Sequence, residues 1–418
     1  EKSGQGFYKK ERGQDGSRIL TLDPATMSHR ERQPARLAAL DAAQSIEDVS
    51  DRIRTLFLGA NNVGEFLRAT LGRTLLYAAE VAPVIAHSID YVDRAMRWGY
   101  GWDLGPFEIW DAIGIDEVLQ SCGVSEPPPL VRDLGPTRRF RDGELEPAAA
   151  DLRLLRQAKR GGPAAAGAGV VKSNPGASLI DLGDGVLALE FHSKMNAIGG
   201  DTIAMLGAGV EEAEQNFEAL VIGNDSTAFS AGANLMLVLL EAQEENWDEI
   251  DLMVRSFQSA VIGLRYAGVP VVVAPAGVAL GGGCEIILHG DRVQAAAETY
   301  MGQVEVGVGL IPAGGGTKEL LAWAIDQKPD GVEDSLPFVK KAFELIGFAK
   351  VSSSAADAKQ LGLLRDVDRV SMNRERVVSD AKSRALELAR SGYQPPQHRL
   401  AIPVGGDTVR AGLELGVH

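Results

Sequence analysis

Cysteine is scarce in this sequence, whose 418 residues contain only Cys122 and Cys284. Two thiols so far apart build no disulfide framework, so we expect a reducing compartment and a cytoplasmic location. Histidine is also sparse, and the six histidines lie far apart without the spacing of metal ligands. The sequence therefore predicts neither structural disulfides nor a metal site.

Long apolar runs and an excess of positive charge are missing as well. No stretch reaches the length of a membrane span, and Glu1, Lys2 and Ser3 do not open a signal peptide. The formal net charge of -15 argues against nucleic-acid binding and against attachment to an anionic membrane. No strand is followed by a GxGxxG turn and a helix, so we expect no NAD-binding domain in this chain.

The N-terminal third combines a polar segment with a helical one. Residues 1–50 are charged and irregular, with the turn signals DGS and DPA, so we expect a loop or a frayed terminus. From residue 45 to residue 95 apolar residues recur at helical spacing, which predicts helices. Residues 89–114 then place Trp98, Trp102, Phe107 and Trp110 between glycines. We interpret these as a core around a tight turn rather than as a ligand cage.

Composition divides the chain into four segments. They are the polar end of a first helical domain (1–50), a helical domain (51–126), a connection with a linker (127–177) and an α/β domain (178–418). Within the connection, residues 151–160 predict a short basic helix. Residues 161–177 are rich in small residues, Gly and Pro, which bury little apolar surface, so we expect an exposed linker there.

The C-terminal segment alternates strands and helices. Residues 178–191 predict a β-hairpin turning at Gly183-Asp184-Gly185, and residues 219–223 and 271–273 predict buried strands. Such alternation is compatible with a stacked ββα spiral and with a doubly wound sheet. Residues 400–418 lack an obvious closing helix.

We place the chemistry in residues 270–317. Three consecutive glycines from Gly281 precede an apolar helix, so the amides near Gly282 should lie at a helix N-terminus, where they bind developing negative charge. Glu285 lies in that helix and Glu305 follows among apolar and glycine neighbours, where a carboxylate needs a task or a partner. A glycine triplet alone indicates a flexible loop, but amides beside two buried acids suit oxyanion stabilisation coupled to proton transfer.

Three motifs carry a resemblance to a known family. FSAGANL from Phe229, ALGGGCE from Ala279 and QVEVGVGLIPAGGGT from Gln303 resemble the crotonase superfamily, over roughly residues 178–370. The resemblance favours the ββα spiral. It also implies an enzyme that binds acyl-CoA thioesters and stabilises an enolate oxyanion.

The same resemblance implies residue roles. The two amides of the oxyanion hole fall on Ala233 and Gly282, and the two catalytic glutamates of the hydratases fall on Glu285 and Glu305. The family's usual acid after Gly-Ala is replaced here by Asn234, which puts a local loop contact in doubt but not the amide of Ala233.

Contacts to the CoA part of the substrate fall, by resemblance, on Lys194, Asn196 and Ala231. For Lys194 a solvated surface lysine is an equally good interpretation. No cofactor is expected in this chain, and the acyl-CoA is its substrate. A second copy of the chain or a thiolase subunit is a partner that the sequence leaves open.

The N-terminal part resembles another family. SGQGFY at residues 3–8 and the string at 89–114 resemble the helical C-terminal domain of 3-hydroxyacyl-CoA dehydrogenases, over about residues 1–120. This implies an all-α N-terminal domain. The nucleotide-binding domain and the His-Glu pair of those enzymes are not in the sequence, so NAD and dehydrogenase activity are expected only in a longer parent protein. Because the chain does not begin with Met, we expect it to be a fragment or a processed form.

The resemblances together imply hydration of trans-2-enoyl-CoA to 3-hydroxyacyl-CoA in fatty-acid β-oxidation. Two alternatives stay open. An enoyl-CoA isomerase resembles a hydratase but commonly keeps only one of the two acids, and a non-catalytic acyl-CoA-binding or scaffolding part of a β-oxidation protein would need neither.

Overall fold

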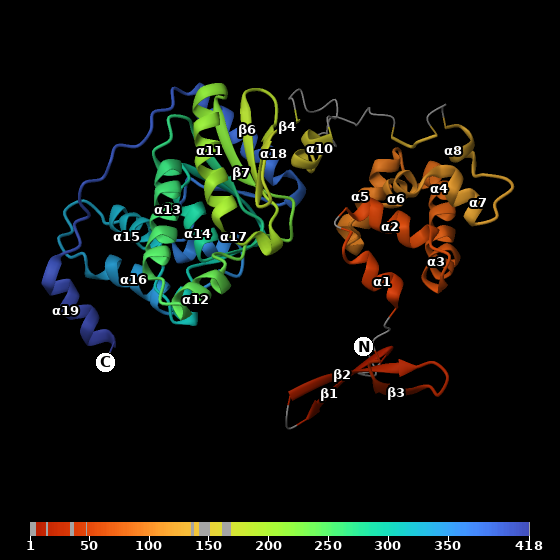
Figure 1. Cartoon of the computed structure of the whole chain (residues 1–418), viewed down its shortest axis with the longest axis horizontal. Coiled ribbons are helices and arrows are strands. Elements are labelled where there is room, and N and C mark those ends of the chain that lie inside the picture. The colour runs from red at the N-terminus through yellow and green to blue at the C-terminus, as the bar shows by residue number, and fades with distance from the viewer. Residues whose placement is uncertain are drawn as a thin grey trace. The chain divides into compact units, whose positions relative to one another are not determined.

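The computed structural model describes residues 6–13, 16–33, 37–46, 48–134, 138–141, 151–160 and 169–417. The chain forms two compact units that divide after residue 142, and each is described by itself (Figure 1). The first unit is mainly helical, and the second is built from mixed and parallel sheets with helices. In the described ranges, no helix is long and apolar enough to cross a bilayer.

A small antiparallel sheet occupies the N-terminal segment. Its strands, in the order β1-β2-β3, are β1 (Tyr8–Gly13), β2 (Gly16–Asp23) and β3 (Ser28–Glu31). Arg18 in the middle strand reaches Glu11 on one side and Glu31 on the other, with N–O distances of 3.1 Å in both pairs. The loop expected over residues 1–50 and the all-α class are therefore wrong here. Charged cross-strand pairs hold strands that lack the apolar alternation by which strands are recognised.

Helices make up the rest of the first unit. They are α1 (Ala38–Ala43), α2 (Val49–Leu58), α3 (Asn62–Leu67), the π-helical turn η1 (Arg68–Gly72), α4 (Arg73–Ile85), α5 (Ile89–Tyr100), α6 (Pro106–Ile113), α7 (Ile115–Ser121) and α8 (Pro129–Arg132). Phe107 and Trp110 are fully buried in their core, and Trp110 Nε1 donates to the Leu75 carbonyl oxygen at 3.1 Å. The aromatic stretch is thus core at these two residues, as predicted, whereas Trp98 is 54% exposed.

Two sheets form the frame of the second unit. The larger has the order β13-β11-β9-β7-β6-β5-β4, and the smaller has the order β12-β10-β8. The strands are β4 (Gly169–Ser173), β5 (Ala177–Asp181), β6 (Val186–Phe191), β7 (Ala219–Gly223), β8 (Ala228–Ser230), β9 (Val271–Ala274), β10 (Gly277–Leu280), β11 (Arg292–Ala296), β12 (Thr299–Gly302) and β13 (Arg369–Ser371). The predicted hairpin is the antiparallel β5–β6 pair, and the two predicted buried strands are β7 and β9.

The strands alternate between the two sheets along the chain. β7, β9 and β11 pair in parallel in the larger sheet, while β8, β10 and β12, which follow them one by one, pair in parallel in the smaller one. A doubly wound fold would place successive strands in one sheet. The repeated step from large sheet to small sheet to helix is the ββα spiral of the crotonase fold.

Helices cover both faces of the larger sheet (Figure 1). The helical elements are α10 (Leu154–Arg160), η2 (Lys194–Asn196), α11 (Gly200–Asn216), α12 (Leu235–Gln243), α13 (Trp247–Arg265), α14 (Gly282–His289), η3 (Glu305–Val308), α15 (Gly316–Asp326), α16 (Leu336–Gly347), α17 (Ala355–Leu361), η4 (Arg374–Arg376), α18 (Val377–Arg390) and α19 (Gly406–Val417). Leu220 and Ile222 of β7 belong to the core that includes α11 and α13, and Val221 between them belongs to the core under α10 and α18. The central strands β7 and β9 are apolar at every position, as expected for strands that are buried on both faces of a sheet.

Two expectations about segment ends are corrected. Residues 161–168 of the predicted linker lie outside the described residues, but Gly169–Ser173 is strand β4, which pairs antiparallel with β5. The Gly-rich composition hid an edge strand whose side chains are mostly exposed. No closing helix was expected over residues 400–418, but α19 lies there, and its Val409 packs with Ile325 and Val339.

Candidate active site

The start of α14 is built from glycines because nothing larger fits. Gly281 has φ 53°, a conformation that favours glycine, and its N–H donates to the Gly302 carbonyl oxygen at 2.9 Å. A Cβ added at Gly282 would lie 2.9 Å from Ile198 Cδ1, and one at Gly283 would lie 2.8 Å from Ser230 Cβ. The close packing fixes the first amides of α14 in a buried position.

The loop after β8 lies against this helix start. Gly232 has φ 93°, and a Cβ there would lie 2.9 Å from the Leu280 carbonyl oxygen and 3.5 Å from Gly282 N. Gly232 accepts from Ile198 N at 2.9 Å, and Asn234 N donates to Ile198 O at 3.1 Å. These two hydrogen bonds engage the Gly232 carbonyl oxygen and the Asn234 N–H, which flank Ala233. Within the described residues, neither Ala233 N–H nor Gly282 N–H has a backbone acceptor. The structure thus places the two predicted oxyanion amides close together, Ala233 in the loop after β8 and Gly282 at the first residue of α14.

Glu285 lies within the first turn of α14, and only 2% of it is exposed. Its Oε1 accepts from the Gly316 N–H at 3.0 Å. Burial raises the pKa of the carboxyl to about 7, and the nearby Glu305 adds to the rise, whereas the N–H groups of Gly316 and Gly314 oppose it. Glu285 therefore changes its ionisation near neutral pH.

Glu305 begins the short η3 turn and is half-buried. Its Oε2 is enclosed and has no hydrogen-bond partner among the described residues, and burial raises the pKa of this carboxyl as well. A Cβ added at Gly281 would lie 3.1 Å from Glu305 Oε1, so the acid borders the helix start. Two acids with raised pKa values and two amides therefore converge, a set that can hold an oxyanion while protons move.

The residues predicted to contact CoA separate into two kinds. Lys194 and Ala231 are exposed, and the Ala231 N–H donates to the Met195 carbonyl oxygen at 3.1 Å, beside the oxyanion loop. Asn196 is buried, and its Nδ2 donates to the Ala228 carbonyl oxygen at 2.8 Å. Its amide thus supports the loop, which leaves Lys194 and Ala231 as the accessible members of this set.

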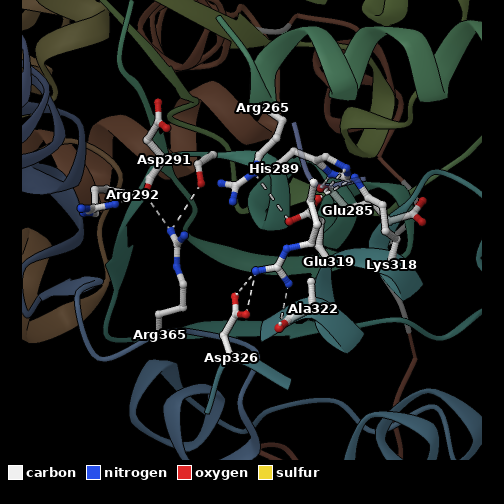
Figure 2. Close-up of polar contacts among 12 residues, drawn as sticks. Arg265, Glu285, His289, Asp291, Arg292, Lys318, Glu319, Ala322, Asp326 and Arg365 are labelled. Carbon is white, nitrogen blue, oxygen red and sulfur yellow. Dashed lines mark hydrogen bonds and ion pairs between the residues drawn. The ribbon is translucent and has the colours of Figure 1, made fainter. Parts of the chain in front are cut away.

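Two polar residues at the site escaped the sequence interpretation. Gln303 is 1% exposed, and neither polar atom of its amide has a partner among the described residues. A Cβ added at Gly316 would overlap Nε2 of Gln303 and lie 2.8 Å from Glu285 Cγ, so the Gln303 amide lies next to the Glu285 side chain. The other is His289, fully buried one turn after Glu285 (Figure 2). For Gln303 the signal was its place two residues before Glu305, and for His289 it was a titratable group in an apolar helix.

Family membership follows from comparison with known sequences. Residues 181–398, more than half of the chain, match the family described as enoyl-CoA hydratase/isomerase. The chain belongs to this family, and the crotonase resemblance is confirmed at the level of family and fold.

Individual relatives extend the comparison beyond that domain. The chain is 40% identical to the probable 3-hydroxyacyl-CoA dehydrogenase of Bacillus subtilis (strain 168), over 99% of this chain and 53% of that protein. It is 25% identical to a putative fatty acid oxidation complex trifunctional enzyme of Rickettsia felis, over 87% and 47%. It is 31% identical to the mitochondrial methylglutaconyl-CoA hydratase of Mus musculus, over 53% and 63%. The chain spans about half the length of the first two relatives.

Proposed function

We propose that this chain hydrates trans-2-enoyl-CoA thioesters to 3-hydroxyacyl-CoA in fatty-acid β-oxidation. The observation that carries the proposal is the pair Glu285 and Glu305, both with raised pKa values, beside the N–H groups of Ala233 and Gly282, which have no backbone acceptor among the described residues. An isomerase needs only one of these acids, and a scaffold needs neither.

In this reaction the two amides bind the thioester oxygen. When water adds to C3, negative charge moves onto that oxygen as the enolate forms, and each preorganised donor contributes about 3 kcal/mol to its stabilisation. Both N–H groups lie where glycines bring two backbones close together, so they are held in place before substrate binds. This rigidity favours the transition state over the substrate.

The two carboxyl groups move the protons. One takes a proton from the attacking water, and a proton is delivered to C2 of the enolate from a carboxyl group. A pKa of about 7 suits Glu285 to this work, because such a group both accepts and returns a proton near neutral pH. Glu305 adds to the rise of the Glu285 pKa, so the proposal covers both acids together.

We further infer that a longer protein containing this chain also oxidises 3-hydroxyacyl-CoA with NAD. The relative from Bacillus subtilis that matches over both units is named a dehydrogenase, and it extends well beyond the matched part. The product of the hydration proposed here is the substrate class that this name implies. Homo-oligomers and a thiolase subunit stay candidate partners.

The test is an absorbance assay of the conjugated thioester with crotonyl-CoA, a 3-enoyl-CoA and 3-methylglutaconyl-CoA as substrates. We expect turnover of crotonyl-CoA to 3-hydroxybutyryl-CoA, identified by mass. Conversion of the 3-enoyl-CoA alone would assign an isomerase instead. No turnover of any of the three by folded protein would refute the catalytic proposal.

A further inference from the structure

His289 ends helix α14, one turn after Glu285, and is fully buried. Its Nδ1 lies 2.7 Å from the carbonyl oxygen of Glu285. A carbonyl oxygen can only accept, so the proton of the imidazole is on Nδ1. The ring is thereby tied to the backbone of the residue whose carboxyl serves the proposed reaction.

The Nε2 edge of the imidazole lies against helix α15. Nε2 lies 3.8 Å from Glu319 Oε1 and has no hydrogen-bond partner among the described residues. Glu319 is itself buried, and it is held by Lys318 Nζ at 2.6 Å and by Arg265 Nε at 3.7 Å. Figure 2 shows Arg265 and Lys318 converging on Glu319 beside the ring.

Helix α15 also contacts the carboxylate of Glu285. Its first residue, Gly316, donates its N–H to Glu285 Oε1 at 3.0 Å. The preceding Gly315 has φ 99°, and a Cβ there would lie 3.2 Å from both Cε1 and Nε2 of His289. The imidazole therefore fills the space between the end of α14 and the start of α15, next to the residue that supplies this hydrogen bond.

We propose that His289 is a positioning residue for Glu285: the buried imidazole, tied to the Glu285 carbonyl and packed against Gly315 and Glu319, sets the hydrogen bond from Gly316 N–H to the Glu285 carboxylate. The kinetic part of this proposal rests on the hydratase function proposed above. Its structural part concerns only the ionisation of Glu285, which can be measured without turnover.

The imidazole acts in this role as a neutral group. Burial lowers its pKa to about 4, although the Glu285 carbonyl and Glu319 oppose the change, and Lys318 and Arg265 are the other charges that face it. His289 thus keeps one charge state over the pH range in which Glu285 titrates. Any pH effect of replacing His289 therefore reflects a change in the ionisation of Glu285, on which the nearby charge of Glu305 also acts.

Three substitutions separate the donor at Nδ1 from the volume of the ring. His289→Asn keeps a donor at the position of Nδ1, His289→Gln moves the amide to the position of Nε2, and His289→Leu keeps bulk alone. We expect the Gln and Leu variants to lower kcat about tenfold with KM little changed, because the loss concerns proton transfer rather than binding. The Asn variant should retain most of the wild-type kcat.

The control is Asp326→Asn at the other end of α15, which removes an ion pair with Arg399 at 2.6 Å without touching the ring. It should leave kcat and its pH profile unchanged. A loss in this control equal to that in His289→Leu would show that any damage to α15 has the same effect, and would overturn the proposal.

The readout independent of turnover is the titration of Glu285 by carbon NMR in protein labelled at the glutamate carboxyl carbon. The signal is assigned by its loss in Glu285→Gln. Because a hydrogen bond to the ionised form lowers a carboxyl pKa, we expect the pKa of Glu285 to rise by about half a unit to one unit in the Gln and Leu variants and to stay near wild type in the Asn variant.

Equal pKa values in all four proteins would overturn the proposal even if the hydratase function holds. The expected shifts in a protein without hydratase turnover would support it while the function fails. If His289→Leu does not fold, the Asn and Gln pair decides alone.

Discussion

Glu285 carries a titratable group in an apolar helix, and burial raises its pKa from the ordinary 4.5 to about 7. Below pH 4.5 the carboxyl is protonated in both the folded and the unfolded chain. As pH rises from 4.5 to 7, the unfolded chain releases this proton and the folded chain keeps it. The folded state therefore loses stability with rising pH, by about 3 kcal/mol once the pH exceeds 7.

Replacing Glu285 by Gln should accordingly stabilise the protein in a pH-dependent way. We expect the melting temperature of the second unit to rise by several degrees at about pH 8 and to change little at about pH 5. Scanning calorimetry of both proteins at both pH values measures this. An equal shift at the two pH values would mean that the buried charge is not its source.

Gly232 tests the packing of the oxyanion loop. With φ 93° and a Cβ position 2.9 Å from the Leu280 carbonyl oxygen, Gly232→Ala should lower stability by about 1–3 kcal/mol and reduce hydration as the Ala233 amide moves. The matched control is Gly207→Ala in α11, where a Cβ meets nothing within 4 Å and helix propensity favours Ala. Denaturant unfolding of the two variants should give effects of opposite sign, and the same sign would contradict the assignment.

At this scale the sequence predicted what short motifs encode. Glu285 and the glycines before it could be found because a carboxylate among apolar residues and a glycine run are visible in one dimension. Gln303 and His289 left weaker signals, because their significance depends on residues brought near by folding, such as Gly316 and Glu319.

Elements of secondary structure followed the same logic. The strands β7 and β9 and the helix α14 were predicted because burial on all sides leaves a nearly uninterrupted apolar run. β4 is an exposed edge strand without that pattern. Helix α19 contains glycines at 406, 412 and 416 that lower its intrinsic propensity, and packing of Val409 stabilises it instead.

Helix α10 is a further element whose role changed. It was predicted as a basic helix within a connection, but Leu155 is fully buried in the core under the sheet, and Lys159 Nζ lies 2.9 Å from each carboxylate oxygen of Glu190. Its basic residues thus serve attachment as well as solvation.

Truncating Leu155 should therefore destabilise the second unit. We expect Leu155→Ala to lower the free energy of unfolding by about 2–5 kcal/mol, because it leaves a cavity in a closed core. Val170→Ala in β4, at a side chain that is 47% exposed, should change it by less than about 0.5 kcal/mol. Urea unfolding followed by circular dichroism compares the two. A negligible effect of Leu155→Ala would mean that α10 is not part of the folded unit.

At the scale of the whole molecule, the division into a mainly helical unit and an α/β unit was predicted from composition and pattern, because a change from helical spacing to strand-helix alternation is visible along the chain. The small N-terminal sheet was not. Charge pairs between strands leave no apolar periodicity to detect. The proposed limits of each domain stay a prediction.

The sequence also contains no strand followed by a GxGxxG turn, which is the usual cradle for a dinucleotide pyrophosphate. We therefore expect this 418-residue chain to show no saturable binding of NADH in a fluorescence titration. A lactate dehydrogenase serves as the positive control. Saturable binding, or oxidation of 3-hydroxyacyl-CoA by this chain, would contradict the division of activities proposed here.

Most directly, the central claim is tested by crotonyl-CoA hydration in the wild-type chain, Glu285→Gln and Glu305→Gln. The substitution keeps size and hydrogen bonding but removes the group that transfers the proton. The account predicts that the wild type turns over and that each variant loses activity by about 10²-fold or more while remaining folded. Near-normal turnover in either variant would remove that glutamate from the mechanism and contradict the account.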